Sequence, residues 1–312
     1  MRDAFINTLM AVAREDSRIF LLTGDLGYSV LERFQQEFPD RFINAGVAEN
    51  NMIGMAAGLA LEGKKPIVYS IAQFISMRCV EHVRLDICLD GADVKLVGVG
   101  GGLSYGAQGP THHATEDLAV MRALPGMTVV APADPIEADL ATRAAIAHDG
   151  PVYLRLGKNG EPKVHQTAPP FILGKAITLR EGKDVTLIAT GGLVHAALKA
   201  ADILAAKGIQ SRVVSMHTVK PIDAEAVVRA AAETRAIATI EEHNILGGLG
   251  GAVAEVFAES GQRGVPFRRF GLPDRFVHEV GSQTYLRRLY GLDPERLAAA
   301  LASWLASAHG LP

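Results

Sequence analysis

A glutamate and a pair of histidines stand where such side chains could carry acid–base chemistry. Glu49 opens a run of helical periodicity over residues 49–62. The helix dipole stabilises a carboxylate in the first turn, and most such residues are simple caps. His112 and His113 end the sequence GPTHH. An imidazole titrates near neutral pH and can bind or transfer a proton, although an isolated histidine is more often structural.

Two glycine-rich stretches are candidates for anion binding. GVGGG at 98–102 follows an apolar run but leads into LSYGAQGPTHH. It therefore lacks the strand, turn and helix of a dinucleotide-binding fingerprint. GGLGG at 247–251 does open a helix, where an anion could bind. The simpler interpretation is that glycine permits a tight turn and close packing there.

The two cysteines, Cys79 and Cys88, lie nine residues apart in a helical pattern over 76–89. At 3.6 residues per turn this spacing places them half a turn out of phase. We therefore expect them to face opposite sides and to form no disulfide. Neither has the flanking charges of an activated thiolate, so both are expected to be small core residues.

Short apolar runs alternate with amphipathic stretches and would position these residues. In the first half, strands are predicted at 19–24, 41–45, 66–70, 94–98, 127–131 and 151–156, and helices at 30–38, 49–62, 76–89, 114–124 and 136–148. The strands are almost continuously apolar, as is typical when helices cover both faces of a sheet. This alternation predicts an α/β fold with mostly parallel sheets.

The sequence KNGEPKVHQTAPP at 158–170 interrupts the alternation with prolines and polar residues. We place a linker at 161–175, between a domain at 1–160 and a smaller α/β domain at 176–312. In the second domain, strands are predicted at 185–189, 212–215, 236–241 and 267–271, and helices at 194–207, 224–233, 250–260 and 294–305.

Composition excludes several classes of function. The 312 residues are 48% hydrophobic and 21% charged, and the net charge is -3. The balanced charge argues against a nucleic-acid or anionic membrane surface. The start MRDAFINTLMAVARED lacks the pattern of a signal peptide, and no apolar run approaches the ~20 residues of a membrane span. We therefore expect a cytoplasmic protein that binds neither nucleic acid nor membrane.

Several motifs, in the same order, resemble the transketolase family over essentially the whole chain. TGDLGYS at 23–29, RFINAGVAENNMIGMAAGLALE at 41–62 and GAQGPTHHATEDLAVMRALPGMTVVAPAD at 106–134 are similar to its pyrimidine-binding domain. VKPID at 219–223 and EEHNILGGLG at 241–250 are similar to its C-terminal domain. The resemblance implies these two domains and thiamine diphosphate as the cofactor.

The resemblance also assigns the residues that bind the cofactor. Glu49 matches the glutamate of the GVxE motif, which hydrogen-bonds the pyrimidine nitrogen and so promotes proton removal from the thiazolium C2. Phe74 matches an aromatic residue against the aminopyrimidine ring, although Ile71 occupies a position that is often aromatic too. Leu26 matches an apolar residue beneath the thiazolium, and Asp25 an acid that orders the site. A core phenylalanine and a loop-capping aspartate are the structural alternatives.

On the substrate side, His112 matches a histidine that contacts the donor hydroxyls, whereas His113 has no matching role. Ser29 and Arg155 match positions that bind the phosphate of the acceptor, a task that suits the planar guanidinium group. An interface ion pair is the alternative for Arg155.

Two departures affect the choice of substrate. Gln108 replaces an aspartate that reads the hydroxyl configuration of the sugar, and Gly100 replaces a second histidine on the phosphate side. The donor and acceptor sugars therefore stay open, and either departure could simply accompany an altered loop.

One expected motif is missing. The family holds the diphosphate through a divalent metal and a GDG motif followed by asparagines. The Asp-Gly pairs at 90–91 and 149–150 lack this context. The resemblance thus implies a split enzyme, in which a separate N-terminal subunit holds the diphosphate and the Mg²⁺ or Ca²⁺ ion. An α2β2 assembly is expected because the two chains share the cofactor.

The leading hypothesis is transfer of a two-carbon ketol unit between sugar phosphates. The alternatives are the β chain of a 2-oxo acid dehydrogenase E1 component and an activity like that of deoxyxylulose-phosphate synthase. A non-catalytic regulatory subunit is a further alternative. Retention of Glu49, His112 and Arg155 together argues against that last one.

Overall fold

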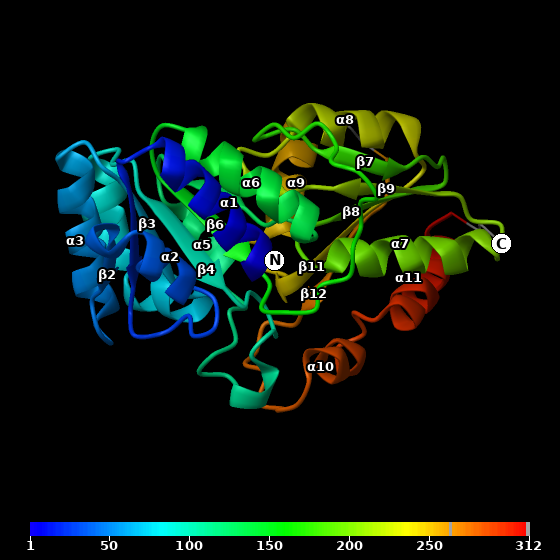
Figure 1. Ribbon diagram of the computed structural model, residues 1–312. Coiled ribbons are helices and arrows are strands. Elements are labelled where there is room, and N and C mark those ends of the chain that lie inside the picture. The colour runs from blue at the N-terminus through cyan, green and yellow to red at the C-terminus, as the bar shows by residue number, and fades with distance from the viewer. Residues whose placement is uncertain (262–263, 310–312) are drawn as a thin grey trace.

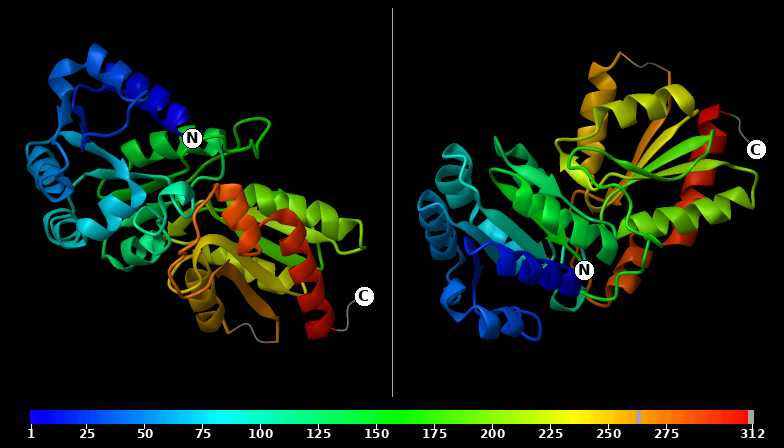
Figure 2. Two further views of the ribbon diagram at one scale, coloured as in Figure 1. Left: turned by 90° about the horizontal axis from the view of Figure 1, so that it is seen from below. Right: turned by 45° about the horizontal axis from the view of Figure 1, so that its top comes forward.

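A computed structural model describes residues 1–261 and 264–309 of the chain. It contains two sheets, each covered by helices on both faces (Figure 1). Figure 2 shows the two layered halves lying side by side. The predicted α/β class with two domains of this type is confirmed.

The first sheet has seven strands in the order β10-β5-β6-β4-β3-β1-β2. All neighbours are parallel except β10, which is antiparallel to β5. The strands are β1 (Ile19–Thr23), β2 (Phe42–Asn44), β3 (Lys65–Ile71), β4 (Lys95–Val99), β5 (Thr128–Val130), β6 (Val152–Leu156) and β10 (Thr218–Lys220).

Two apolar cores fill the faces of this sheet. On one face α1 (Arg2–Glu15), α2 (Glu32–Glu37) and α6 (Pro135–Ala147) pack against the sheet. The opposite face carries α3 (Glu49–Leu61), α5 (Asp117–Ala123) and a helical run composed of η2 (Phe74–Arg78), α4 (Val80–His82) and η3 (Val83–Leu89). Both η2 and η3 are π-helical. Two short 3-10 turns, η1 (Pro39–Arg41) and η4 (Gly106–Gln108), complete this half.

The second sheet has five strands in the order β12-β11-β8-β9-β7. They are β7 (Ile177–Arg180), β8 (Val185–Ala189), β9 (Ser211–Ser215), β11 (Ile237–Asn244) and β12 (Phe267–Leu272), and only β7 is antiparallel to its neighbour. One face packs against α7 (Leu193–Ala205) and α11 (Pro294–His309), and the other against α8 (Ala224–Glu233) and α9 (Leu249–Glu259). The short helix α10 (Gln283–Leu289) contacts η4 of the first half.

Two α-helices and two strands were not predicted: α1, α10, β7 and β10. Of these, β10 belongs to the second half of the sequence but completes the edge of the first sheet. Cys79 is buried, Cys88 is half-buried and both are free thiols, as expected of small core residues. Both pack in the same apolar core, however, which does not match the expectation that they face opposite sides. Among the described residues, we find no helix with the length and apolar character needed to cross a membrane.

Candidate active site

The candidate residues gather at one edge of the first sheet. Strands β1, β3, β4 and β6 are parallel, so the loops that follow them leave the sheet on the same side. Asp25 and Leu26 follow β1, Glu49 follows β2, Phe74 follows β3, and His112 lies in the loop after β4. Open α/β sheets bind ligands beyond the carboxyl ends of their strands. The fold therefore places these five residues where a ligand would bind.

Glu49 is the first residue of α3 and is buried, with 2% of its surface exposed. Arg78 Nη1 donates to Glu49 Oε2 at 2.6 Å. No hydrogen bond to Oε1 is found within the described part of the chain. The loop after β1 comes close, because a side chain at Gly24 would begin 3.8 Å from Glu49 Cγ. Glu49 is thus a buried carboxylate with one oxygen paired and the other open.

Phe74, Arg78 and His112 form a connected group beside this carboxylate. The guanidinium of Arg78 lies 4.7 Å from the centre of the Phe74 ring, a cation–π distance. The His112 ring meets Phe74 edge-on, with 5.1 Å between ring centres. Partial burial lowers the pKa of His112, so its ring is neutral at pH 7. Thr111 Oγ1 lies 3.0 Å from His112 Nδ1.

The loop after β1 is held in an unusual conformation. Asp25 and Ser29 have φ angles of 55° and 65°, a region that costs energy for residues other than glycine. Asn44 holds Asp25 in place, since the Asp25 N–H donates to Asn44 Oδ1 at 3.0 Å. The Ser29 N–H donates to Glu32 Oε1 at 2.7 Å. Leu26 is half-buried against the core, whereas Asp25 and Ser29 are exposed.

Tyr105 occupies the space that a side chain at position 100 would need. Gly100 has a φ of 80°, and the first side-chain carbon at this position would overlap the Tyr105 ring. The Tyr105 ring centre lies 6.1 Å from that of His112. The ammonium group of Lys158 lies 4.4 Å from the centre of the same ring. Tyr105 and Lys158 therefore extend the group that contains His112.

Gln108 is exposed at the end of η4, four residues before His112. His113 is buried, and neither of its ring nitrogens has a hydrogen-bond partner in the described structure. Of the two positions that could match the family's aromatic residue, Ile71 is the last residue of β3, whereas the Phe74 ring contacts the His112 ring.

Arg155 lies beneath the site as part of a buried ion pair. Its Nε donates to Asp117 Oδ2 at 2.8 Å, and its Nη2 donates to Asp117 Oδ1 and to the carbonyl oxygens of Ala114 and Glu242. Tyr153 adds a hydrogen bond to Asp117 at 2.7 Å. Burial alone would lower the pKa of Arg155, but the Asp117 carboxylate outweighs it and the pKa is raised. Arg155 is therefore part of an ion pair, which was the alternative to a phosphate contact.

Sequence reasoning missed Arg78, Tyr105 and Lys158. Lys158 comes two residues after β6, which is a signal for this edge of the sheet, but the surrounding prolines favoured a linker. Arg78 lies four residues after Phe74, a spacing that brings side chains together on a helix. For Tyr105 no local signal exists, because its place depends on Gly100.

A carboxylate of the same chain binds the N–H groups at the glycine-rich start of α9. Glu241 is buried and accepts hydrogen bonds from the N–H groups of Leu249 at 2.7 Å and Gly250 at 2.8 Å. An internal carboxylate therefore occupies the position where an anion could have bound. Burial raises the pKa of Glu241 to about 7, although the two N–H groups act in the opposite direction.

No metal site is found among residues 1–261 and 264–309. No group of three or more His, Cys, Asp or Glu side chains there could hold a metal ion.

Two family models match most of the chain. Residues 1–162 match the pyrimidine binding domain of transketolase, and residues 174–297 match the transketolase C-terminal domain.

Relatives of similar length are subunits of larger enzymes. The chain is 44% identical to 6-deoxy-6-sulfo-D-fructose transketolase subunit SqwH of Clostridium sp. (strain MSTE9), over 96% of this chain and 92% of the relative. It is 42% identical to a subunit of the apulose-4-phosphate transketolase of Phocaeicola vulgatus, over 94% of each. The 1-deoxy-D-xylulose-5-phosphate synthase 1 of Geobacter sulfurreducens is 41% identical over 99% of this chain, but the match spans only 48% of that protein.

Among solved structures, a split gene transketolase described as an inactive beta4 tetramer superimposes with a TM-score of 0.88. It is 39% identical and the match covers 98% of this chain and 97% of that one.

The buried pair gives a stability prediction. Asp117→Ala would leave the Arg155 charge buried without its partner, so the free energy of unfolding should fall by about 3–5 kcal/mol. Equilibrium urea unfolding measures this change. The matched control is Asp202→Ala, which removes an exposed partner of Arg180 and should cost about 0.2–1 kcal/mol. Equal losses in the two variants would contradict a structural role for the Asp117–Arg155 pair.

Proposed function

The chain belongs to the transketolase family, and we propose that it works with a separate N-terminal subunit to transfer a two-carbon ketol unit between sugar phosphates. It is a subunit of a split transketolase, because it matches both family domains and aligns end to end with subunits of such enzymes. The connected group of Glu49, Phe74 and His112 is the observation that carries the proposed chemistry.

The alternatives have weaker support. The synthase of Geobacter sulfurreducens is about twice as long as the part of it that this chain matches. A non-catalytic subunit has no need of a buried carboxylate with one open oxygen beside an aromatic ring and a neutral histidine. We therefore favour a catalytic subunit.

The residues present fit thiamine diphosphate, on which the family depends. Glu49 is buried and its Oε1 has no hydrogen-bond partner among the described residues, so this oxygen could share a proton with a ring nitrogen of the pyrimidine. We propose that Phe74 lies against that ring, that Leu26 supports the thiazolium, and that Asp25 orders the loop beside it. When bound, the cofactor supplies the carbanion chemistry that breaks and forms carbon–carbon bonds. The protein supplies orientation and the proton.

At the substrate end, His112 is the proposed contact to the donor hydroxyls. Its ring is neutral, so one nitrogen can donate and the other can accept a hydrogen bond. Gln108 stands at the exposed end of the same loop and is proposed to contact the sugar as well. An amide both donates and accepts, whereas the aspartate of the family only accepts.

We assign the phosphate contact to Lys158, with Ser29 as a second candidate. Arg155 was the first candidate, but its Nε and Nη2 already bind protein acceptors and only 7% of its surface is exposed. Lys158 is half-buried, and its ammonium group has an aromatic ring but no carboxylate beside it in the described structure. A phosphate would supply that missing negative charge.

The partner subunit is proposed to hold the diphosphate and its Mg²⁺ or Ca²⁺ ion. This proposal agrees with the lack of an acidic or histidine cluster among the residues that the structure describes. An α2β2 assembly with two-fold symmetry would let two pairs of subunits share two cofactors. The cytoplasmic location stays a prediction from the sequence.

Replacing Glu49 tests the catalytic assignment. Glu49→Gln keeps the size of the side chain but removes the carboxyl group that shares a proton with the pyrimidine. Exchange of the C2 hydrogen of the cofactor for deuterium in the assembled enzyme should slow by about 10²–10⁴-fold. Glu62→Gln at the other end of α3 is the control and should exchange normally. An unchanged rate in Glu49→Gln would return Glu49 to the role of a helix cap.

Replacing Lys158 tests the phosphate contact. Lys158→Met removes the charge and keeps the length of the side chain. The KM of phosphorylated substrates should rise roughly ten- to a hundredfold, and that of an unphosphorylated analogue much less, because a charge-assisted contact contributes about 1.5–3 kcal/mol. Lys163→Met changes an exposed lysine of the same segment and serves as the control. Equal rises for both substrates would show that Lys158 serves the structure instead.

The split assembly predicts the behaviour of the chain alone. Calorimetric titration of the purified single chain with thiamine diphosphate and Mg²⁺ should show weak or no binding, since the diphosphate end lacks ligands. Adding the partner subunit should restore tight binding. Tight, metal-dependent binding by the single chain would overturn the split-enzyme proposal.

A further inference from the structure

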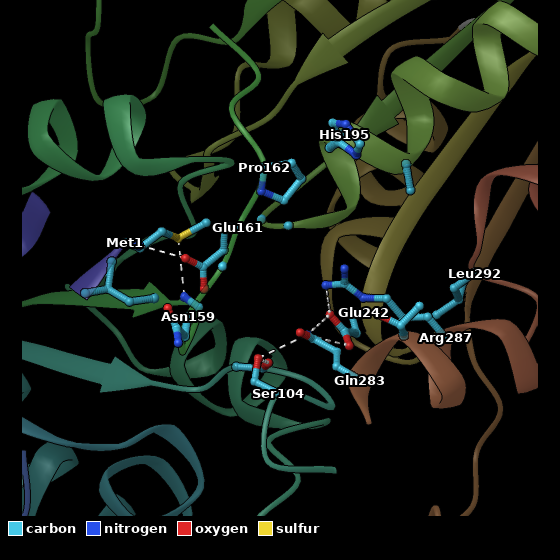
Figure 3. A pocket seen from close by; sticks show the side chains of 18 of the residues that line it. Met1, Ser104, Asn159, Glu161, Pro162, His195, Glu242, Gln283, Arg287 and Leu292 are labelled. Carbon is cyan, nitrogen blue, oxygen red and sulfur yellow. Dashed lines mark hydrogen bonds and ion pairs between the residues drawn. The ribbon is translucent and has the colours of Figure 1, made fainter. Parts of the chain in front are cut away.

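A cavity of about 400 Å³ lies between the two halves of the molecule, apart from the group that contains Glu49. Polar side chains from both halves line it. Ser104 and Asn159 come from the first half, and His195, Gln283 and Arg287 from the second. Figure 3 shows these side chains around an open space, with Glu161 across it from Arg287.

Two guanidinium groups converge on the start of α7 at one side of this cavity. A side chain at Gly191 would begin 4.0 Å from Arg155 Nη1, and one at Gly192 would begin 3.0 Å from Arg287 Nη2. Glu242 binds both groups, Arg155 through its carbonyl oxygen and Arg287 through its carboxylate. The two arginines are therefore fixed side by side at a helix N-terminus.

Several donors at this place have no acceptor within the described residues. Arg287 Nε is buried and unpartnered. Arg155 lines the cavity, and its Nη1 makes no hydrogen bond to those residues although the side chain is 7% exposed. At the start of α7 the Val194 N–H donates to the Gly191 carbonyl oxygen, whereas the N–H groups of Gly192 and Leu193 have no acceptor among the described residues. Buried donors without acceptors are costly, so such a cluster points to a missing acceptor.

Free N–H donors and the helix dipole, rather than net charge, favour an anion at this side of the cavity. Asp117 and Glu242 already balance the two guanidinium groups, so the attraction comes from the free N–H groups and the positive end of the α7 dipole. Burial lowers the pKa of His195, and the positive charges of Lys199 and Arg287 lower it further. Glu161, Glu242 and Asp293 also line the cavity, and Asp293 Oδ2 is buried without a hydrogen-bond partner in the described structure. Glu161 lies on the far side and is paired with the amino terminus of Met1.

We propose that this cavity is a second binding site, for a small hydroxylated metabolite that carries an oxyanion group such as phosphate or sulfonate. The oxyanion binds between Arg155, Arg287 and the start of α7. Ser104, Asn159 and Gln283 bind the hydroxyl groups of the remainder, which the cavity has room to hold. None of the residues to which ketol transfer is assigned takes part.

The site also touches the loops that carry the proposed substrate contacts. Ser104 is next to Tyr105, and Asn159 is next to Lys158. A ligand here would therefore contact the same two segments that carry Tyr105 and Lys158. Such a ligand can change substrate affinity only as far as it favours one arrangement of these loops.

Sulfate is a suitable probe because its charge is constant across the neutral pH range. Calorimetric titration of the assembled enzyme at constant ionic strength should detect sulfate binding that Arg287→Gln weakens by about tenfold or more. Arg288→Gln, its exposed neighbour on α10, is the matched control and should bind normally. Lys158→Met should also retain this binding. If Lys158→Met abolishes sulfate binding and Arg287→Gln does not, the anion binds only at the substrate site and the proposal is wrong.

His195→Gln provides a test that does not disturb Glu242. Sulfate should bind the unmodified enzyme more tightly as pH falls, because protonated His195 adds a positive charge. The variant should bind several-fold more weakly at low pH and lose that part of the pH dependence. Identical affinities and identical pH profiles in the two proteins would overturn the proposal even if Arg287→Gln fails to assemble. A sugar phosphate and free phosphate, titrated in parallel into Lys158→Met so that binding at the substrate site is weakened, distinguish a metabolite from the inorganic ion by the tighter binding expected for the former.

Discussion

The buried pair between Asp117 and Arg155 holds the structure together at its centre. Arg155 lies on β6 and binds the start of α5, the end of the loop that carries His112, and the backbone of β11 in the second sheet. One guanidinium therefore ties three segments that are far apart in sequence. A buried ion pair is stabilising only when its hydrogen bonds are well satisfied, and here Tyr153 and two carbonyl oxygens add to them, so that Arg155 Nη1 is the group of the pair left without an acceptor among the described residues.

The proposed active site is built on that fixed base by loops at the edge of a parallel sheet. Each loop contributes few residues, and contacts from neighbouring elements or from within the loop hold them in place. Asn44 holds Asp25, Arg78 holds Glu49, and Tyr105 fills the space beside Gly100. Positive φ angles at Asp25 and Ser29 store local strain that the surrounding contacts offset. A rigid sheet edge with strained loops is suited to binding a cofactor in one conformation.

The sequence was informative where a residue's role depends on its own segment. The buried strand at 185–189 and the helix at 224–233 have the bounds predicted for them, because continuous apolar runs and helical periodicity are local signals. Strands β7 and β10 were missed because they are short edge strands, and pairing decides them more than composition does. The family resemblance gave Arg155 a phosphate role, and its ion-pair partner, Asp117, could not be identified because it is distant in sequence. Lys158 was given no role for a similar reason, since its neighbour Tyr105 is also distant in sequence.

The pairing of β10 with β5 makes the two halves mutually dependent. Expressed without the second half, the first would expose the whole of β5 as an unpaired sheet edge, with buried apolar residues on both faces. Open edges of this kind recruit strands from other molecules and lead to aggregation. Lys220 strengthens the connection, since its ammonium group caps the carbonyl oxygens of Arg122 and Leu124 at the end of α5. In terms of gene architecture, a break between the two family domains of this chain would separate the first sheet from the strand that completes its edge.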